Sequence, residues 1–366
     1  MGPPLHFEFP EIALRRVPQM GLAELERIRL ILRGGSVIDW RRLHVESNDE
    51  VDHFFRLCGI DLGNSWDEAW VRVVLEDAVK YLRMTFKYRV TQAVANPSDV
   101  RDLFLYASGL KEPRFRRIAC IVLKVMHVIQ HIEGRDLLFR LAVSEEQISD
   151  LVTRRVLEAV EPLSAKGGPL VKVSTSTKSR ESLVTKLLAK KETVAAQVYD
   201  KTRFRLVTRS HEDLLPVLHY LTERLFPFNF VVPGQTENSL LRFKQVVTEN
   251  PHFKRYADEL HLDVDFEDRE MQGSNPFSGR EYQVLNFVVD VPVRMDSYLP
   301  PPDDDRRERK SRIGFTLVEF QVVDQETAKD NEKGENAHRR YKRRQLIKVL
   351  QRLSKGLVVP KRKGED

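Results

Sequence analysis

The pattern of apolar and polar positions changes near the middle of the chain. From Gly21 to about Pro162, apolar residues recur at steps of three and four, which is typical of amphipathic helices. The strongest of these patterns predict helices over residues 65–87, 114–133 and 144–160. After Gly167, apolar and polar residues alternate in short runs that are typical of strands, and helical patterns separate these runs. The sequence therefore predicts an α/β (α+β) protein, in which a helical N-terminal region precedes a mixed sheet that carries helices.

Four strands and three helices are predicted in the second half of the chain. The apolar runs place the strands at residues 197–208, 228–232, 281–293 and 315–324. A polar run at 174–177 leads into the first helix, and the other two helices are expected at about 210–225 and 335–353. The predicted parts are a helical region, a mixed-sheet domain and a basic tail, over residues 1–163, 164–356 and 357–366.

The composition is that of an ordinary soluble globular protein. Of the 366 residues, 41% are hydrophobic and 31% are charged. No apolar run approaches the roughly 20 residues that cross a bilayer, and the N-terminus does not have the pattern of a signal peptide. We therefore expect a cytoplasmic protein with no membrane partner. Cys58 and Cys120 have no metal-like spacing and are predicted to be buried free thiols.

The positive charge of the chain is concentrated near its C-terminus. The net charge is +6, and the segment from His338 to Lys363 has many Lys and Arg residues and no acid. Such a segment attracts polyphosphate or RNA through its field. The alternative interpretation is a solvated basic helix face followed by a frayed end.

Two histidines four residues apart, His127 and His131, lie on the predicted helix at 114–133. This spacing can hold a metal ion, but the nearby Glu133 is not placed as in the HExxH arrangement. We therefore interpret both residues as partly buried, hydrogen-bonded histidines.

Residues that suit a triphosphate with Mg²⁺ collect around the predicted strand at 197–208. Before it, Lys178, Ser182 and Lys186 recur every four residues, so they lie on one face of a helix. On the strand itself, the carboxylate of Asp200 precedes the cation of Arg205. The alternative interpretation is a solvated Lys/Ser helix face beside a charged edge strand.

The strand at 315–324 supplies a second carboxylate. Glu319 and Gln321 point to the same side because they are two residues apart. If the strands carrying Asp200 and Glu319 are neighbours, the two acids can face one cleft. One acid would then hold Mg²⁺, and the other would share the metal ion or deprotonate an attacking hydroxyl group.

Several of these residues follow in order along a set of motifs. Arg-x-Lys-x-x-x-Ser-x-x-x-Lys matches at Lys178, Ser182 and Lys186, and Asp-x-x-Gly-Ile-Arg-Ile matches at Asp200, Phe204, Arg205 and Leu206. Gly-Tyr-x-x-Leu-His matches in part at Tyr282 and Leu285, Val-Glu-x-Gln at Val318, Glu319 and Gln321, and Ala-His-x-x-Tyr-Lys at Ala337, His338, Tyr341 and Lys342. In these motifs, the segment from about Lys172 to Lys342 resembles the synthetase domain of the RelA/SpoT alarmone (ppGpp) synthetases.

The resemblance implies a nucleotidyltransferase-like fold and an activity that moves pyrophosphate from ATP to the 3′-hydroxyl of GDP or GTP. It also implies Asp200 as the Mg²⁺ ligand, Glu319 as the catalytic glutamate, which acts as base or second metal ligand, and Tyr282 as the residue that stacks on guanine. The remaining matched residues would bind nucleotide and phosphate: Lys178, Ser182, Lys186, Arg205, Gln321, His338 and Lys342.

Several positions depart from the motifs: Ser176 and Arg203 replace an arginine and a glycine, and Asn286 and Val323 replace a histidine and an arginine. Arg280 and Glu281 stand where the motifs have Asn-Gly before the tyrosine. Two functions therefore stay open. The first is a Mg²⁺-dependent pyrophosphotransferase or nucleotidyltransferase that uses ATP and acts on a nucleotide or an RNA 3′-hydroxyl. The second is a catalytically inactive module that binds nucleotide or RNA, the latter through the basic C-terminal helix.

Overall fold

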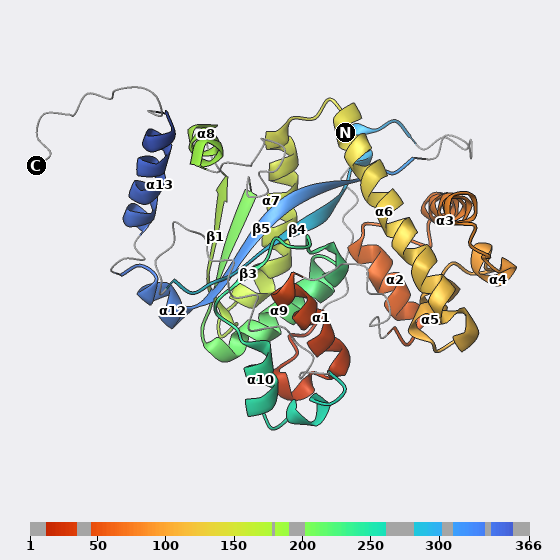
Figure 1. Cartoon of the computed structure of the whole chain (residues 1–366), viewed down its shortest axis with the longest axis horizontal. Coiled ribbons are helices and arrows are strands. Elements are labelled where there is room, and N and C mark those ends of the chain that lie inside the picture. The colour runs from red at the N-terminus through yellow and green to blue at the C-terminus, as the bar shows by residue number, and fades with distance from the viewer. Residues whose placement is uncertain are drawn as a thin grey trace, which may run out of the picture.

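A computed structural model describes residues 12–34, 45–177, 180–189, 202–260, 282–301, 310–333 and 338–353. Its first part is helical, as the sequence predicts (Figure 1). The helices are α1 (Leu22–Arg33), α2 (Asn48–Leu57), α3 (Ser65–Phe86), α4 (Gln92–Ala95), α5 (Asp102–Ser108), α6 (Arg116–Arg140) and α7 (Glu145–Val160). The helices predicted at 65–87 and 144–160 are thus confirmed, and the one predicted at 114–133 continues to Arg140.

The second part contains a mixed five-stranded sheet in the order β1-β2-β5-β4-β3. The strands are β1 (Leu170–Thr177), β2 (Thr202–Thr208), β3 (Glu237–Asn238), β4 (Leu285–Arg294) and β5 (Ile313–Asp324). Strands β2 and β5 run parallel, and the other neighbours are antiparallel. The helices of this part are α8 (Arg180–Ala189), α9 (Leu214–Arg224), α10 (Phe243–Glu249), α12 (Gln325–Asp330) and α13 (His338–Leu353). The mixed α+β fold class is confirmed.

One predicted strand was wrong and one strand was missed, for different physical reasons. Residues 228–232 begin with a short 3-10 helix, Phe228–Phe230, and only Val231 forms a bridge, with Val289 of β4. A short apolar run has the same appearance in a strand and in other buried segments, so periodicity could not distinguish them. Conversely, the polar run at 174–177 belongs to β1, which lies at the edge of the sheet and is mostly exposed. Its residues therefore lack the apolar alternation of a half-buried strand.

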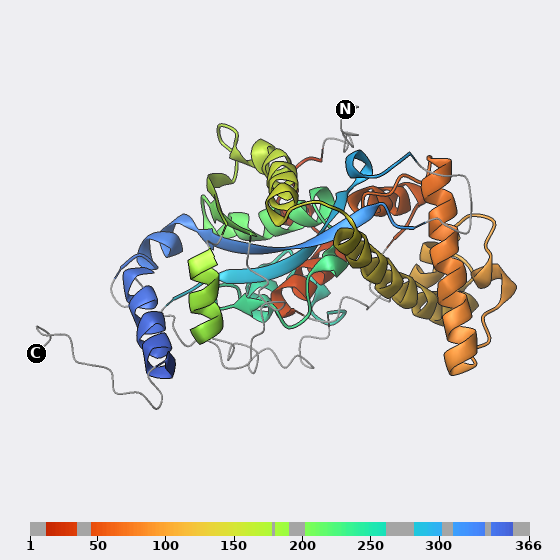
Figure 2. The same cartoon turned by 90° about the horizontal axis from the view of Figure 1, so that it is seen from above.

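One face of the sheet is apolar. The fully buried rings of Phe204, Phe320 and Phe287 lie side by side across β2, β5 and β4, with centroids 5.8 and 5.5 Å apart. Helix α7 lies on this side, where Ser149 Oγ is 3.0 Å from Thr202 Oγ1. Figure 2 shows α7 and α8 on opposite sides of the sheet. The second face is therefore the one available for polar side chains.

Helix α6 joins the N-terminal helices to the sheet. A Cβ at Gly134 would lie 2.3 Å from the Phe315 ring, so only glycine allows α6 to approach β5 this closely. In addition, Arg294 of β4 makes a buried bidentate pair with Asp67 of α3, at 2.6 and 3.0 Å. The apolar core is accordingly continuous from the helical part into the sheet. Both cysteines are buried free thiols, as predicted.

Candidate functional site

A row of polar residues crosses the whole sheet, with one residue from each strand. Ser174 of β1 pairs with Arg205 of β2, and Arg205 pairs with Gln321 of β5. Gln321 pairs with Asn286 of β4, which in turn pairs with Glu237 of β3. Paired residues on adjacent strands lie on the same face, and each strand is about 4.8 Å from the next. We call these five residues the polar row, and the side of the sheet that carries them the polar face.

Beside the polar row, an arginine from the neighbouring strand holds Glu319. Arg203 of β2 is directly opposite Glu319 of β5, and Arg203 Nε donates to Glu319 Oε2 at 2.9 Å. Gln321 Nε2 donates to the second carboxylate oxygen, Oε1, at 3.4 Å. Only 3% of Glu319 is exposed, and a carboxylate buried to this degree is costly unless donors surround it. These two donors therefore explain how Glu319 is accommodated inside the sheet layer.

Arg205 is a cation of the polar face that has no counter-ion among the described residues. Its side chain is half-buried, and within the described part of the chain no hydrogen bond or ion pair holds its guanidinium group. Two places along the polar row, Asn286 Oδ1 is also buried and has no hydrogen-bond partner among the described residues. A guanidinium group in this setting suits a phosphate or carboxylate, which accepts two of its N–H groups at once.

Tyr282 lies beside the same face, just before β4 begins. Asn331 fixes this segment, because its Oδ1 accepts from Gln283 N at 3.1 Å and its Nδ2 donates to Gln283 O at 2.6 Å. Burial raises the pKa of Tyr282, and the nearby Arg205 and Arg203 offset part of this rise. The aromatic ring is therefore held within electrostatic range of both arginines.

The structure brings four of the sequence-predicted site residues to this face: Arg205, Tyr282, Glu319 and Gln321. Lys178 and Asp200 lie outside the described residues. The condition that the two strands be neighbours is met, because β2 and β5 are adjacent and parallel. The pairing of Asp200 with Glu319 stays a prediction.

The other predicted residues lie on two helices that pack against each other, α8 and α13 (Figure 1). Ser182 and Lys186 belong to α8, and His338 and Lys342 belong to α13. Of these, Ser182 is half-buried and Lys342 is exposed, while the side chains of Lys186 and His338 lie outside the described part.

Mg²⁺ does not fit at Glu319 with its present neighbours. A guanidinium group has only N–H donors and supplies no electron pair to a metal ion. Arg203 therefore faces Glu319 Oε2 on the side where a cation would lie. Across the described ranges, no group of three or more His, Cys, Asp or Glu residues is arranged to hold a metal ion.

The contact of Arg203 with Glu319 was not predicted from the sequence, where Arg203 was singled out as the replacement of a glycine. The period of two already put Arg203 with Arg205 on one face, and Glu319 with Gln321 on one face. What was lacking was the register between β2 and β5, which places the opposite charges directly across from each other. Glu237, at the end of the polar row, carried no sequence signal because β3 has only two residues.

A second polar cluster lies where α6 packs on β4. His131 Nε2 is 3.6 Å from Asp290 Oδ2, and Arg135 is 3.7 Å from the same oxygen. His131 Nδ1 lies 3.0 Å from the main-chain oxygen of His127, whose own Nδ1 is 3.3 Å from Asn229 Nδ2. Burial lowers the pKa of both histidines and raises the pKa of Asp290. The prediction of partly buried, hydrogen-bonded histidines is confirmed.

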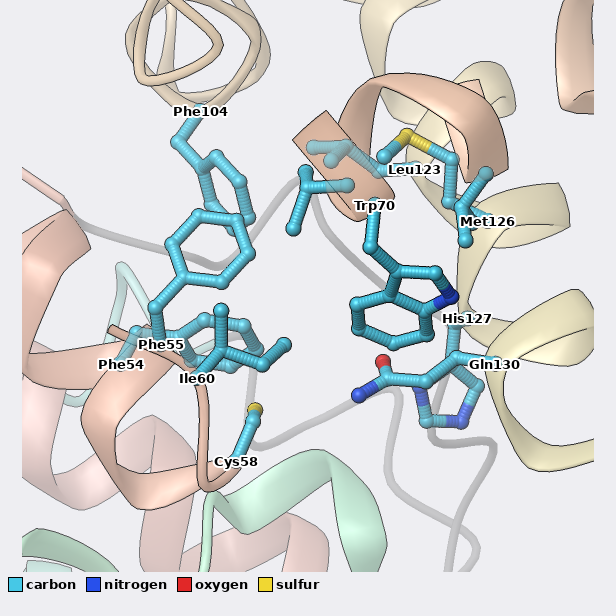
Figure 3. Close-up of a pocket in the computed structure, with 12 residues that line it drawn as sticks. Phe54, Phe55, Cys58, Ile60, Trp70, Phe104, Leu123, Met126, His127 and Gln130 are labelled. Carbon is cyan, nitrogen blue, oxygen red and sulfur yellow. The ribbon is translucent and has the colours of Figure 1, made fainter. Parts of the chain in front are cut away.

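Two hollows in the described part of the structure lie away from the polar row. Figure 3 shows a small cavity of about 40 Å³ among the N-terminal helices, lined mainly by apolar side chains such as Phe55, Trp70 and Met126, with His127 and Gln130 at its edge. A second hollow of about 310 Å³ is lined by parts of residues 16–18, 167–169 and 209–216. The first is far smaller than the roughly 300–1,000 Å³ of typical ligand sites, and neither contains a residue of the polar row.

Among the described helices, none combines the length and the apolar character that a membrane span requires.

No family model matches the sequence, and no curated protein matches it either. Solved structures similar to this chain include small alarmone synthetase 1 from Bacillus subtilis, with 14% identity, a TM-score of 0.30, and coverage of 57% of this chain and 86% of that one. The same synthetase bound to its product pppGpp has 13% identity, a TM-score of 0.29, and coverage of 58% and 90%. A GTP pyrophosphokinase family protein from Streptococcus pneumoniae has 14% identity, a TM-score of 0.29, and coverage of 57% and 87%. These proteins are of the kind that the motifs resemble, but at such identities and TM-scores the likeness carries no argument about function.

Proposed function

We propose that this chain binds a nucleoside polyphosphate, such as ATP, on the polar face of its sheet. The observation that carries the proposal is Arg205, a half-buried cation of the polar row that makes no ion pair with any described residue. Phosphate oxygens would accept its N–H groups in a bidentate arrangement. The ring of Tyr282, held nearby, would stack on the base, which aromatic rings do without selecting a particular one.

The pair of Arg203 with Glu319 favours a binding or regulatory function at this face. In the present arrangement the carboxylate already accepts a hydrogen bond from a guanidinium group and a second one from Gln321. An incoming hydroxyl group would therefore have to reach a lone pair of the carboxylate that these two donors leave open. A nucleotide could still bind, because Arg205, Tyr282 and Asn286 do not depend on this pair.

The second candidate function is pyrophosphoryl transfer from ATP, which the retained Glu319 favours. A buried carboxylate is costly, and a site that only binds an anion gains nothing from keeping one. In this reaction an acceptor hydroxyl oxygen forms a bond to the β-phosphorus of ATP. The bond from that phosphorus to the bridging oxygen on its α side breaks, AMP leaves, and Glu319 takes the hydroxyl proton. For this step, the hydroxyl group must reach a lone pair of Glu319 that Arg203 and Gln321 leave open.

The test separates binding from transfer with one set of proteins. ATP and GTP binding is measured by calorimetry, and transfer is measured with γ-labelled ATP and GDP, GTP or bulk tRNA as acceptor. RNA belongs in this set because Lys342, Arg343 and Lys348 are exposed on α13. Binding that is lost in Arg205→Ala, with no label transferred, supports the binding function. Label that moves to an acceptor, and is lost in Glu319→Gln, establishes transfer, whereas no nucleotide binding at all refutes both.

A further inference from the structure

We infer that Arg203 occupies the place of a divalent cation at Glu319, so that the polar face binds nucleoside polyphosphate without a metal ion. The nucleotide part of this inference rests on the proposed function. The part that concerns Glu319 and metal ions is independent of it and can be tested with no nucleotide present.

The geometry gives Arg203 a fixed position at the carboxylate. Arg203 and Glu319 are directly opposite each other on adjacent parallel strands, and the strand pairing continues on both sides of them from Thr202 to Thr208. The backbone therefore keeps the guanidinium group within reach of the carboxylate and needs no loop to move. The distance of 2.9 Å is that of a charge-assisted hydrogen bond.

Both carboxylate oxygens are engaged. Oε2 accepts a hydrogen bond from Arg203, and Oε1 accepts one from Gln321 Nε2. Only 3% of Glu319 is exposed to solvent. A divalent cation that bound here would have to displace Arg203, since Mg²⁺ needs oxygen ligands at short range in a nearly octahedral arrangement. It would also lose most of its water, which Mg²⁺ does reluctantly.

The charges on the polar face also disfavour a metal ion. On the adjacent strands β2 and β5, the described residues of the polar face carry the cations of Arg203 and Arg205 and the anion of Glu319. The other anion of the polar row, Glu237, lies two strands away from β5, on β3. A metal ion would add two further positive charges next to two arginines, and like charges at this range disfavour each other. A polyphosphate brings the opposite charge. ATP without Mg²⁺ is more negative than the Mg²⁺ complex, so the two arginines should favour the metal-free form.

The first experiment uses Mn²⁺ alone as the probe, followed by its electron paramagnetic resonance signal with the full chain. We expect wild type and Glu319→Gln to bind the same amount of Mn²⁺. We expect Arg203→Ala to gain a Mn²⁺ site that is lost again in the double variant Arg203→Ala/Glu319→Gln. Circular dichroism checks that each variant is folded. If Arg203→Ala does not fold, Arg203→Gln removes the charge while keeping an N–H donor for the buried carboxylate.

Two results of this experiment overturn the inference. The first is Mn²⁺ binding by wild type that falls in Glu319→Gln, because the carboxylate would then bind metal despite Arg203. The second is a folded Arg203→Ala or Arg203→Gln that gains no Mn²⁺ site dependent on Glu319. Arg203 would then not be the group that keeps a divalent cation from Glu319.

The second experiment measures ATP binding to wild type by calorimetry, with Mg²⁺ and with excess EDTA. We expect an affinity in EDTA that equals or exceeds the affinity in Mg²⁺. Binding that disappears in EDTA overturns the metal-free site. Absence of ATP binding under both conditions refutes the proposed function, while the Mn²⁺ experiment still decides whether Arg203 stands in for a cation.

Discussion

Replacing Arg205 by glutamine tests the proposed nucleotide site most directly. The guanidinium group is half-buried, so solvent screens its contact with phosphate less than it screens a surface pair. Hydrogen bonds to charged groups contribute about 1.5–3 kcal/mol. Since each 1.4 kcal/mol is about tenfold in affinity, Arg205→Gln should weaken ATP binding by roughly 10- to 150-fold. The protein itself should lose about 0.5 kcal/mol of stability or less, because the change leaves no internal partner unpaired.

The assay is calorimetric titration of ATP into wild type, Arg205→Gln and Arg154→Gln, with urea unfolding of each protein. Arg154→Gln is the matched control, since Arg154 is exposed on α7, on the opposite side of the sheet from α8. It removes the same charge at a distance from the polar row, so its ATP affinity should equal that of wild type. Unchanged ATP affinity in a folded Arg205→Gln would refute the phosphate contact. An equal loss in both variants would instead mean that ATP responds only to the overall positive charge.

Three further changes test how the scaffold holds this face. Gly134→Ala should cost about 1–3 kcal/mol in urea unfolding, because its Cβ would overlap the Phe315 ring, and Phe315→Leu should restore part of the loss. Asp67→Asn should cost about 1.5–3 kcal/mol, because Arg294 loses its bidentate carboxylate but keeps Asp296 and the main-chain oxygen of Gly59, and Asp67→Leu/Arg294→Met should recover part of this loss. His127 should make stability depend on pH: burial lowers its pKa below the ordinary value of 6.5, so the unfolded chain binds the proton first and stability is lost as pH falls below about 6.5. In His127→Gln the slope of unfolding free energy against pH between 7 and 5 should be smaller, and an unchanged slope would assign it to other groups.

The sequence was informative where local pattern alone decides the structure. The period of the apolar residues found α3 and α7 with nearly correct ends, because a helix that buries one face needs that repeat wherever it packs. The strands β4 and β5 were found for a similar reason, since their long apolar runs are buried. Edge strand β1 was missed because its exposure does not require apolar residues.

The site could be predicted residue by residue but not as an arrangement. Glu319, Gln321 and Arg205 were recognised individually, and alternation assigned each to a face. Which residues lie opposite each other depends on strand order and register, and these follow from the packing of the whole sheet. The contact of Arg203 with Glu319 is such a product of register, and for that reason no motif contained it.

The free energy of the ion pair between Arg203 and Glu319 relates the two candidate functions to each other. Leaving one member of a buried ion pair without its partner costs about 3–5 kcal/mol, whereas a nucleotide with a Kd of about 1 μM supplies about 8 kcal/mol. Phosphates that took over Arg203 could therefore release Glu319 and turn a binding site into a catalytic one. If binding requires this release, Glu319→Gln should bind ATP more tightly than wild type, because Arg203 no longer has to leave a carboxylate. If Arg203 stays on Glu319, the variant should bind ATP no more tightly than wild type. Calorimetry on wild type and Glu319→Gln thus decides whether ATP binding breaks the pair of Arg203 with Glu319. A higher ATP affinity of Glu319→Gln would contradict a pair that stays intact when ATP binds.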